Sequence, residues 1–124
     1  MRAMKKILIV EDVEFNRDLL VQLLEDRYEV VTAMDGEEGI RLAEQDRPDL
    51  ILMDLSLPVI DGWEATRRIK ASEALRNIPV IALSAHAMTG DEDRARQSGC
   101  DDYVSKPLDE DTLFEKLDKF LGSP

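Results

Sequence analysis

The sequence has no apolar run near the roughly 20 residues needed to span a bilayer, although 44% of its 124 residues are hydrophobic. Its basic start also lacks the continuous apolar stretch of a signal peptide. A single cysteine, Cys100, excludes an internal disulfide, so we expect a cytoplasmic protein. We expect Cys100 itself to be a small, partly buried side chain after Gly99, not a nucleophile.

Positive charge is scarce as well. The chain has 16 lysines and arginines against 27 aspartates and glutamates, and its formal net charge is -11. Such an acidic surface repels phosphate backbones and anionic lipids, so we expect no nucleic-acid partner and no membrane partner. Neither a Walker A pattern nor GxGxxG occurs, so nucleotide binding has no local support. The acidic charge either serves solubility or is concentrated where a cation binds.

Short runs of Val, Ile and Leu alternate along the chain with segments whose apolar residues have helical spacing. The runs lie at residues 7–10, 30–33, 50–53, 80–83 and, more weakly, 103–104. Most of them show no polar alternation, which is typical of parallel strands covered on both faces. Asp35, Asp61 and Thr89 each stand three residues before a glutamate, as helix N-caps do.

This alternation predicts one α/β domain that spans residues 1–124, with a core from about 5 to 121. The expected fold is a doubly wound parallel sheet of five strands in the order 2-1-3-4-5, with five helices. In such a sheet the site lies at the carboxyl ends of strands one and three, where the winding reverses.

Acidic residues follow these two strands. Glu11 and Asp12 end the first, and Asp54 ends the third. Two unit charges about 4 Å apart interact by about 4 kcal/mol at an effective dielectric constant of about 20, so three carboxylates need a proton or a cation among them. Oxygen ligands without clustered His or Cys favour a hard ion, and we predict that Glu11 and Asp12 hold Mg2+ beside Asp54.

Two further polar groups end on the same edge of the predicted sheet. Ser84 follows strand four and supplies a hydroxyl donor, and Lys106 follows strand five and supplies a fixed positive charge. Taken singly, Lys106 is an ordinary surface lysine and Ser84 a turn residue. Around Asp54 they form a clamp for a transferring phosphoryl group, which a carboxylate can accept as an aspartyl phosphate.

Four segments, ILIVED, LILMDLSLPVIDGWE, IPVIALSA and DDYVSKP, together resemble the receiver domain of two-component response regulators over essentially the whole chain. The resemblance implies a flavodoxin-like fold and a signalling protein, not an enzyme with a separate substrate. Its partner would be a histidine kinase or histidine phosphotransfer protein. By position, the resemblance implies that Asp54 is the phosphoacceptor. Asp12 and Asp54 would ligate Mg2+ directly, Glu11 through water, and Ser56 through its backbone carbonyl.

The same resemblance implies a switch. Ser84 matches the switch hydroxyl, Tyr103 the aromatic switch position and Lys106 the family's lysine, with a cis peptide at Lys106-Pro107. Ser56 and the single histidine, His86, would tune hydrolysis of the aspartyl phosphate. The alternative for His86 is an ordinary surface loop residue.

We expect no output domain, because the chain stops three residues after its last helical leucine. The signal would then leave through a surface made by a fourth helix around residues 94–98, the fifth strand and the final helix at 111–121, and would regulate a partner protein. Arg94, Arg96 and Lys119 are candidate contacts there. The pattern leaves open whether the protein is a monomer or a phosphorylation-linked dimer.

A different class remains possible: a small-molecule phosphatase or phosphotransferase that works through an aspartyl phosphate. Haloacid-dehalogenase-like enzymes usually carry a second aspartate two residues after the nucleophile, where this chain has Ser56. The chain also lacks the length for cap elements that would enclose a substrate.

Overall fold

The structure, a computed structural model, describes residues 4–84 and 97–122. Its five strands form one parallel sheet in the order β2-β1-β3-β4-β5, which confirms the predicted topology. The elements are β1 (Lys6–Val10), α1 (Glu14–Leu24), β2 (Glu29–Ala33), α2 (Gly36–Asp46), β3 (Leu50–Asp54), α3 (Gly62–Ala71), β4 (Val80–Ser84), β5 (Asp102–Ser105) and α5 (Glu110–Leu121).

The described residues contain four helices of this set and not the five expected. The fourth helix expected around residues 94–98 falls largely outside them, and so do Thr89 and His86 as well as Arg94 and Arg96. Across residues 4–84 and 97–122, no helix combines the length and the apolar content that a membrane crossing requires.

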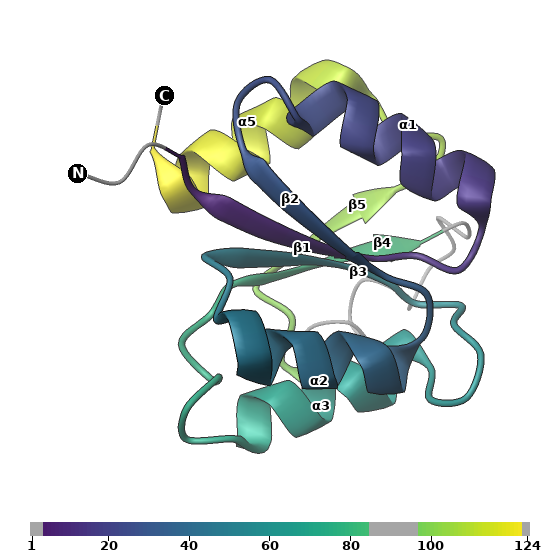
Figure 1. Cartoon of the computed structure of the whole chain (residues 1–124), viewed down its shortest axis with the longest axis vertical. Helices are drawn as coiled ribbons and strands as arrows, with labels where there is room; N and C mark the ends of the chain where they lie inside the picture. The colour runs from purple at the N-terminus through teal and green to yellow at the C-terminus, as the bar shows by residue number, and fades with distance from the viewer. Residues whose placement is uncertain (1–3, 85–96, 123–124) are drawn as a thin grey trace.

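The sheet is the middle of three layers. Helices α1 and α5 cover one face, and α2 and α3 cover the other (Figure 1). Successive residues of β1 serve the two faces in turn, because Ile7 and Ile9 join the core under α1 and α5 while Leu8 and Val10 join the core under α2 and α3. Strands β1, β3 and β4 are buried on both faces, so their sequences are nearly continuous apolar runs.

The winding reverses beside β1. The chain leaves β1, crosses one face through α1 to β2, then returns across the other face through α2 to β3. Val10 of β1 pairs with Met53 of β3, so the residues that follow them, Glu11 and Asp54, emerge side by side at the carboxyl edge. The register of two strands therefore brings the acids together.

Two of the N-caps predicted from the sequence are confirmed, and the structure adds a third. Asp35 and Asp61 cap α2 and α3, each accepting a hydrogen bond from the backbone N–H of the glutamate three residues later, at 2.8 and 2.9 Å. Asp109 caps α5 in the same way, which the sequence pattern did not predict. Helix α1 has no such cap, because its N-cap residue is Val13.

Gly99 directly follows the helical residues Gln97 and Ser98, and its φ of 104° is a conformation that favours glycine. A side chain there would also collide with Lys70, whose Cγ would lie 2.9 Å from the added Cβ. The Lys70 ammonium binds Asp101 at 2.7 Å and ties α3 to the start of β5. Cys100 stands between Gly99 and Asp101 in the sequence. Its side chain is buried, and burial raises the pKa of its thiol.

Asp102 joins the edge strand β5 to α5. Its carboxylate accepts from Lys116 Nζ at 2.8 Å and lies 3.5 Å from Lys119 Nζ. Burial alone would raise the pKa of Asp102, but the Lys116 hydrogen bond, the Tyr103 N–H and the two lysine charges bring it below its ordinary value. The carboxylate form therefore stabilises the fold.

We predict that Asp102→Asn lowers the free energy of unfolding at pH 7 by about 1 kcal/mol, because the largely buried Lys116 ammonium loses its charged partner. A lowered pKa means that this contribution is present above the ordinary pKa of an aspartate and is lost as the pH falls through the folded value. Urea denaturation should show the gap between the proteins closing below about pH 4. Glu115→Gln, the same charge loss at an exposed site on α5, should change stability by less than about 0.5 kcal/mol at either pH.

Candidate functional site

Glu11 is a buried carboxylate and not a solvated strand end. It is 0% exposed, and its backbone N–H donates to Ala33 O at 3.0 Å, which extends the β1–β2 ladder by one residue. Its carboxylate accepts from the Val13 N–H at 3.1 Å and from Lys106 Nζ at 2.9 Å. A buried acid with a charged partner belongs to a built site.

Asp54 ends β3 and is 3% exposed. Its Oδ1 accepts from the Ser56 N–H at 3.2 Å and lies 3.5 Å from Lys106 Nζ. One ammonium group therefore serves two carboxylates from different strands. The backbone of Lys106 is itself held, because its N–H donates to the carbonyl oxygen of Ser84 at the end of β4.

The protonation of the pair depends on this contact. Burial raises the pKa of Glu11, the neighbouring Asp54 raises it further, and the Lys106 ammonium opposes both. Burial would lower the pKa of Lys106, but its bond to Glu11 and the two negative charges outweigh that effect and raise it. Lys106 therefore keeps its positive charge at neutral pH.

Glu11, Asp12 and Asp54 each offer a carboxylate oxygen, and these atoms lie within 4.8 Å of one another. Asp12 is exposed, so the cluster opens to solvent on its side. A set of oxygen donors without a sulfur or imidazole ligand suits a hard divalent cation such as Mg2+. The cluster could hold that ion.

The two residues predicted to form the switch, Ser84 and Tyr103, lie on neighbouring strands. Ser84 ends β4, is 3% exposed and pairs with Ser105 of β5. Tyr103 stands two residues before Ser105 and so shares its face of the sheet. It is half-buried and packs against the core under α2 and α3. The Lys106-Pro107 peptide is cis, as predicted.

In the loop after Asp54, Val59 has a positive φ of 68°. Glycine is required at position 62 for a close approach, because an added Cβ would lie 2.2 Å from the carbonyl oxygen of Asp54. Trp63 beside it packs in the core under α2 and α3.

Sequence reasoning missed Arg17. This residue is the fourth of α1, and its Nη1 donates to the carbonyl oxygen of Glu11 at 3.1 Å and to that of Asp12 at 3.5 Å. The spacing of five residues from Asp12 is visible in the sequence. An arginine in a helix gives no sign, however, that it will turn back toward a loop.

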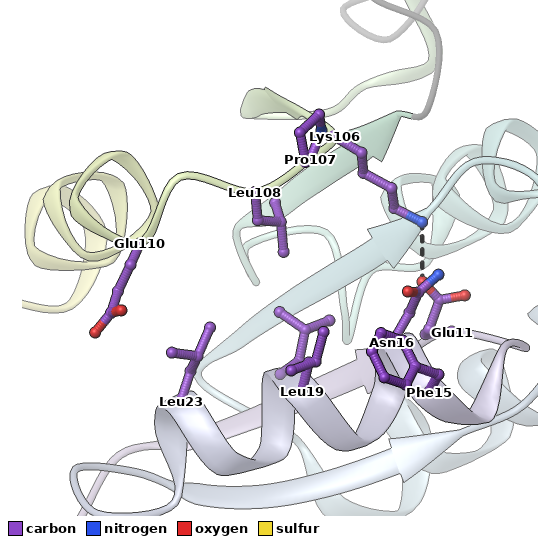
Figure 2. A pocket seen from close by; sticks show the side chains of 10 residues that line it. Glu11, Phe15, Asn16, Leu19, Leu23, Lys106, Pro107, Leu108 and Glu110 are labelled. Atoms are coloured by element: carbon purple, nitrogen blue, oxygen red, sulfur yellow. Dashed lines mark hydrogen bonds and ion pairs between the residues drawn. The ribbon is translucent and has the colours of Figure 1, made fainter.

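Sequence reasoning also missed an apolar groove that runs from the site along α1 (Figure 2). It has a volume of about 630 Å³, with Glu11 and Lys106 at one end. Phe15 and Leu19 of α1 line it and are 72% and 45% exposed. The opposite wall is the segment from Lys106 to Leu108. Large exposed apolar side chains that line a groove are typical of a protein-binding surface.

Comparison with known proteins gives a consistent result. The model of the response regulator receiver domain family matches residues 7–118. The polar-differentiation response regulators DivK of Brucella anthropi and Brucella ovis are each 46% identical over 119 residues, which cover 95% of this chain and 97% of each relative.

Two solved structures are informative. The receiver domain of sensor histidine kinase PA1611 from Pseudomonas aeruginosa superimposes with a TM-score of 0.90 at 42% identity, covers 98% of this chain and 100% of its own, and has a magnesium ion coordinated in its active-site cleft. The receiver domain of Ssk1 from Saccharomyces cerevisiae, crystallised with the histidine phosphotransfer protein Ypd1, gives 0.88 at 29% identity and covers 97% of this chain and 90% of its own.

We predict that Asp12→Ala weakens Mg2+ binding by more than about tenfold, because one of three clustered carboxylates is lost. In metal-free buffer the same change should raise the denaturation midpoint by about 2–4 °C, because it relieves repulsion among like charges. Calorimetric Mg2+ titration and thermal denaturation in EDTA measure the two effects. Glu115→Gln removes an equal charge far from the cluster and should affect neither. An unchanged Mg2+ titration for Asp12→Ala would show that the cluster is not the cation site.

Proposed function

The chain belongs to the family of response regulator receiver domains, and we propose that it is a phosphorylation-dependent signalling switch whose phosphoacceptor is Asp54. As a receiver domain it takes part in two-component signal transduction and is a signalling protein, not a metabolic enzyme. The observation that carries the proposal is one ammonium, Lys106 Nζ, held 2.9 Å from Glu11 and 3.5 Å from Asp54 beside the acid cluster.

In this proposal an oxygen of the Asp54 carboxylate attacks the phosphorus of a phosphohistidine on the donor protein. The new O–P bond forms as the P–N bond breaks, and the imidazole of the donor keeps the electron pair. Asp54 suits this role because it is almost fully buried while its carboxylate lies within 4.8 Å of the carboxylate of the exposed Asp12. Lys106 and the Ser84 hydroxyl stabilise the negative charge of the phosphoryl oxygens.

Asp12 and Asp54 would hold Mg2+ directly, Glu11 through a water molecule and Ser56 through its carbonyl oxygen. When bound, the ion neutralises charge on the transferring phosphoryl group. The oxygen donor set of this chain and the magnesium ion in the Pseudomonas aeruginosa receiver domain both support this assignment. Ser56 is exposed beside Asp54, which suits a role in the hydrolysis of the aspartyl phosphate.

The aspartyl phosphate carries about -1.5 to -2 charges beside Lys106, where the Asp54 carboxylate carries only one. We propose that Ser84 then moves toward the phosphoryl group and Tyr103 turns into the space released, as a population shift between two packings. Support comes from the sheet, since Ser84 and Tyr103 share one face on adjacent strands. The changed surface would include β5 and α5, where Lys119 is exposed, and would regulate a protein target.

The groove along α1 would receive the phosphodonor. Receiver domains work with histidine kinases and histidine phosphotransfer proteins, and the Ssk1 receiver domain was crystallised with such a protein. The groove suits this role because Phe15 and Leu19 are exposed next to the Lys106–Glu11 pair, so a helix docked there lies beside the acceptor (Figure 2).

We predict that Asp54→Asn keeps the fold, since the two side chains have the same shape, and abolishes phosphorylation. The test is acid-labile incorporation of phosphate from acetyl phosphate with Mg2+, followed by mass spectrometry of the labelled residue. Persistent labelling at another residue would sink the assignment. Turnover of a panel of phosphate esters by the wild type, without a stable label, would favour the small-molecule phosphatase instead.

We predict that Phe15→Ser slows phosphotransfer from a phosphorylated histidine phosphotransfer protein by about tenfold or more, because an exposed aromatic anchor is lost. Phosphorylation by acetyl phosphate, which needs no docking surface, should change by less than about twofold. Lys119→Glu is the reciprocal variant and should weaken target binding while leaving both rates intact. Equal slowing of both donors by Phe15→Ser would place its effect in the site and not in docking.

A further inference from the structure

The three carboxylates of the cluster are not held equally. Lys106 contacts the side chains of Glu11 and Asp54. Asp12 is exposed, and the hydrogen bond recorded for it within residues 4–84 and 97–122 reaches its backbone carbonyl, not its carboxylate. The direction of the Cα–Cβ bond of Asp12 is therefore set by its backbone.

Arg17 fixes that backbone. The carbonyl of Glu11 belongs to the peptide group before Asp12, and the carbonyl of Asp12 belongs to the one after it. The Arg17 Nη1 donates to both, at 3.1 and 3.5 Å. Because the orientation of the two flanking peptide groups determines φ and ψ of the residue between them, one guanidinium determines where the Cα–Cβ bond of Asp12 points.

In the loop between β1 and α1, no N-cap side chain restrains the backbone at Val13. The N-cap residues of α2, α3 and α5 are aspartates whose side chains accept a backbone N–H, whereas the N-cap of α1 is Val13, whose side chain cannot accept one. The Val13 N–H is instead bound by the Glu11 carboxylate. Arg17 therefore restrains the loop from inside the helix.

We propose that Arg17 is a positioning residue for the cation site, and that its guanidinium holds the Asp12 backbone so that the Asp12 carboxylate lies against Glu11 and Asp54. The inference rests on the proposed function in so far as the cation is Mg2+. Arg17 contacts no carboxylate of the cluster among the interactions of the described residues, so it acts through the loop.

The sign of its effect separates positioning from simple charge. A positive charge beside a cation site repels the cation, so loss of charge alone would tighten Mg2+ binding. Loss of positioning weakens it. The weakening is also selective, because Mg2+ demands near-ideal octahedral geometry while Ca2+ accepts a flexible set of oxygens.

The experiment titrates the wild-type protein and three variants with Mg2+ and with Ca2+ by calorimetry. Arg17→Gln removes the charge and the Nη1 donor of both hydrogen bonds. Arg17→Lys keeps the charge but ends in an ammonium on a flexible stem, without the fixed N–H directions of the planar guanidinium. Arg67→Gln is the matched control, because Arg67 is an exposed arginine on α3 paired with Glu64. Thermal denaturation in EDTA verifies that each variant is folded.

We expect Arg17→Gln to raise the dissociation constant for Mg2+ about tenfold and that for Ca2+ less than about threefold. Arg17→Lys should recover part of the Mg2+ affinity, and Arg67→Gln should match the wild type within about twofold. If Arg17→Gln does not fold, Arg17→Lys carries the test by the same selectivity criterion.

Mg2+ binding by Arg17→Gln that equals or exceeds that of the wild type would overturn the inference alone, and so would equal weakening for both ions. A wild-type protein that binds neither ion would overturn the assignment of Mg2+ in the proposed function, and the role of Arg17 with it.

Discussion

The contact of the Lys106 ammonium with Glu11 and Asp54 is the constraint on which the site depends. Two carboxylates that are 0% and 3% exposed would each cost several kcal/mol to bury without a partner. Lys106 reaches them only if β5 is paired in register with β4, where its N–H meets the carbonyl of Ser84. The edge strand is therefore as necessary to the site as the two central strands that carry the acids.

Most of the fold could be predicted from the sequence because its signals are local. A strand buried on both faces is apolar along most of its length, so the sequence predicts β1, β3 and β4. Asp35 and Asp61 each stand three residues before a glutamate, and this spacing predicts the starts of α2 and α3. The N-cap at Asp109 was not predicted, because the residue three positions later is Thr112 and not a glutamate. The need for glycine at position 62 could not be predicted, because it depends on how closely α3 approaches Asp54 in space.

The residues of the candidate site also fall into a group that the sequence predicts and a group that depends on packing in space. Glu11, Asp12, Asp54 and Lys106 were predicted to meet because strand ends in a doubly wound sheet must share an edge, and the structure brings them together. Arg17 and the groove along α1 depend on where long side chains turn after packing, and no spacing rule encodes that. The switch roles of Ser84 and Tyr103 concern a second packing and stay predictions.

Formal charge gives the cluster a further property. Three carboxylates and one ammonium leave a net charge of minus two, which a single divalent cation cancels in full. A monovalent ion would leave the site anionic, and an ion of higher valence would make it cationic. In the proposed function, Asp54 becomes an acyl phosphate that replaces its one negative charge by up to two, so the loaded site would fall about one charge short of neutrality. That residual charge would attract hydrogen-bond donors, and it would turn a chemical modification of one side chain into an electrostatic force on its neighbours.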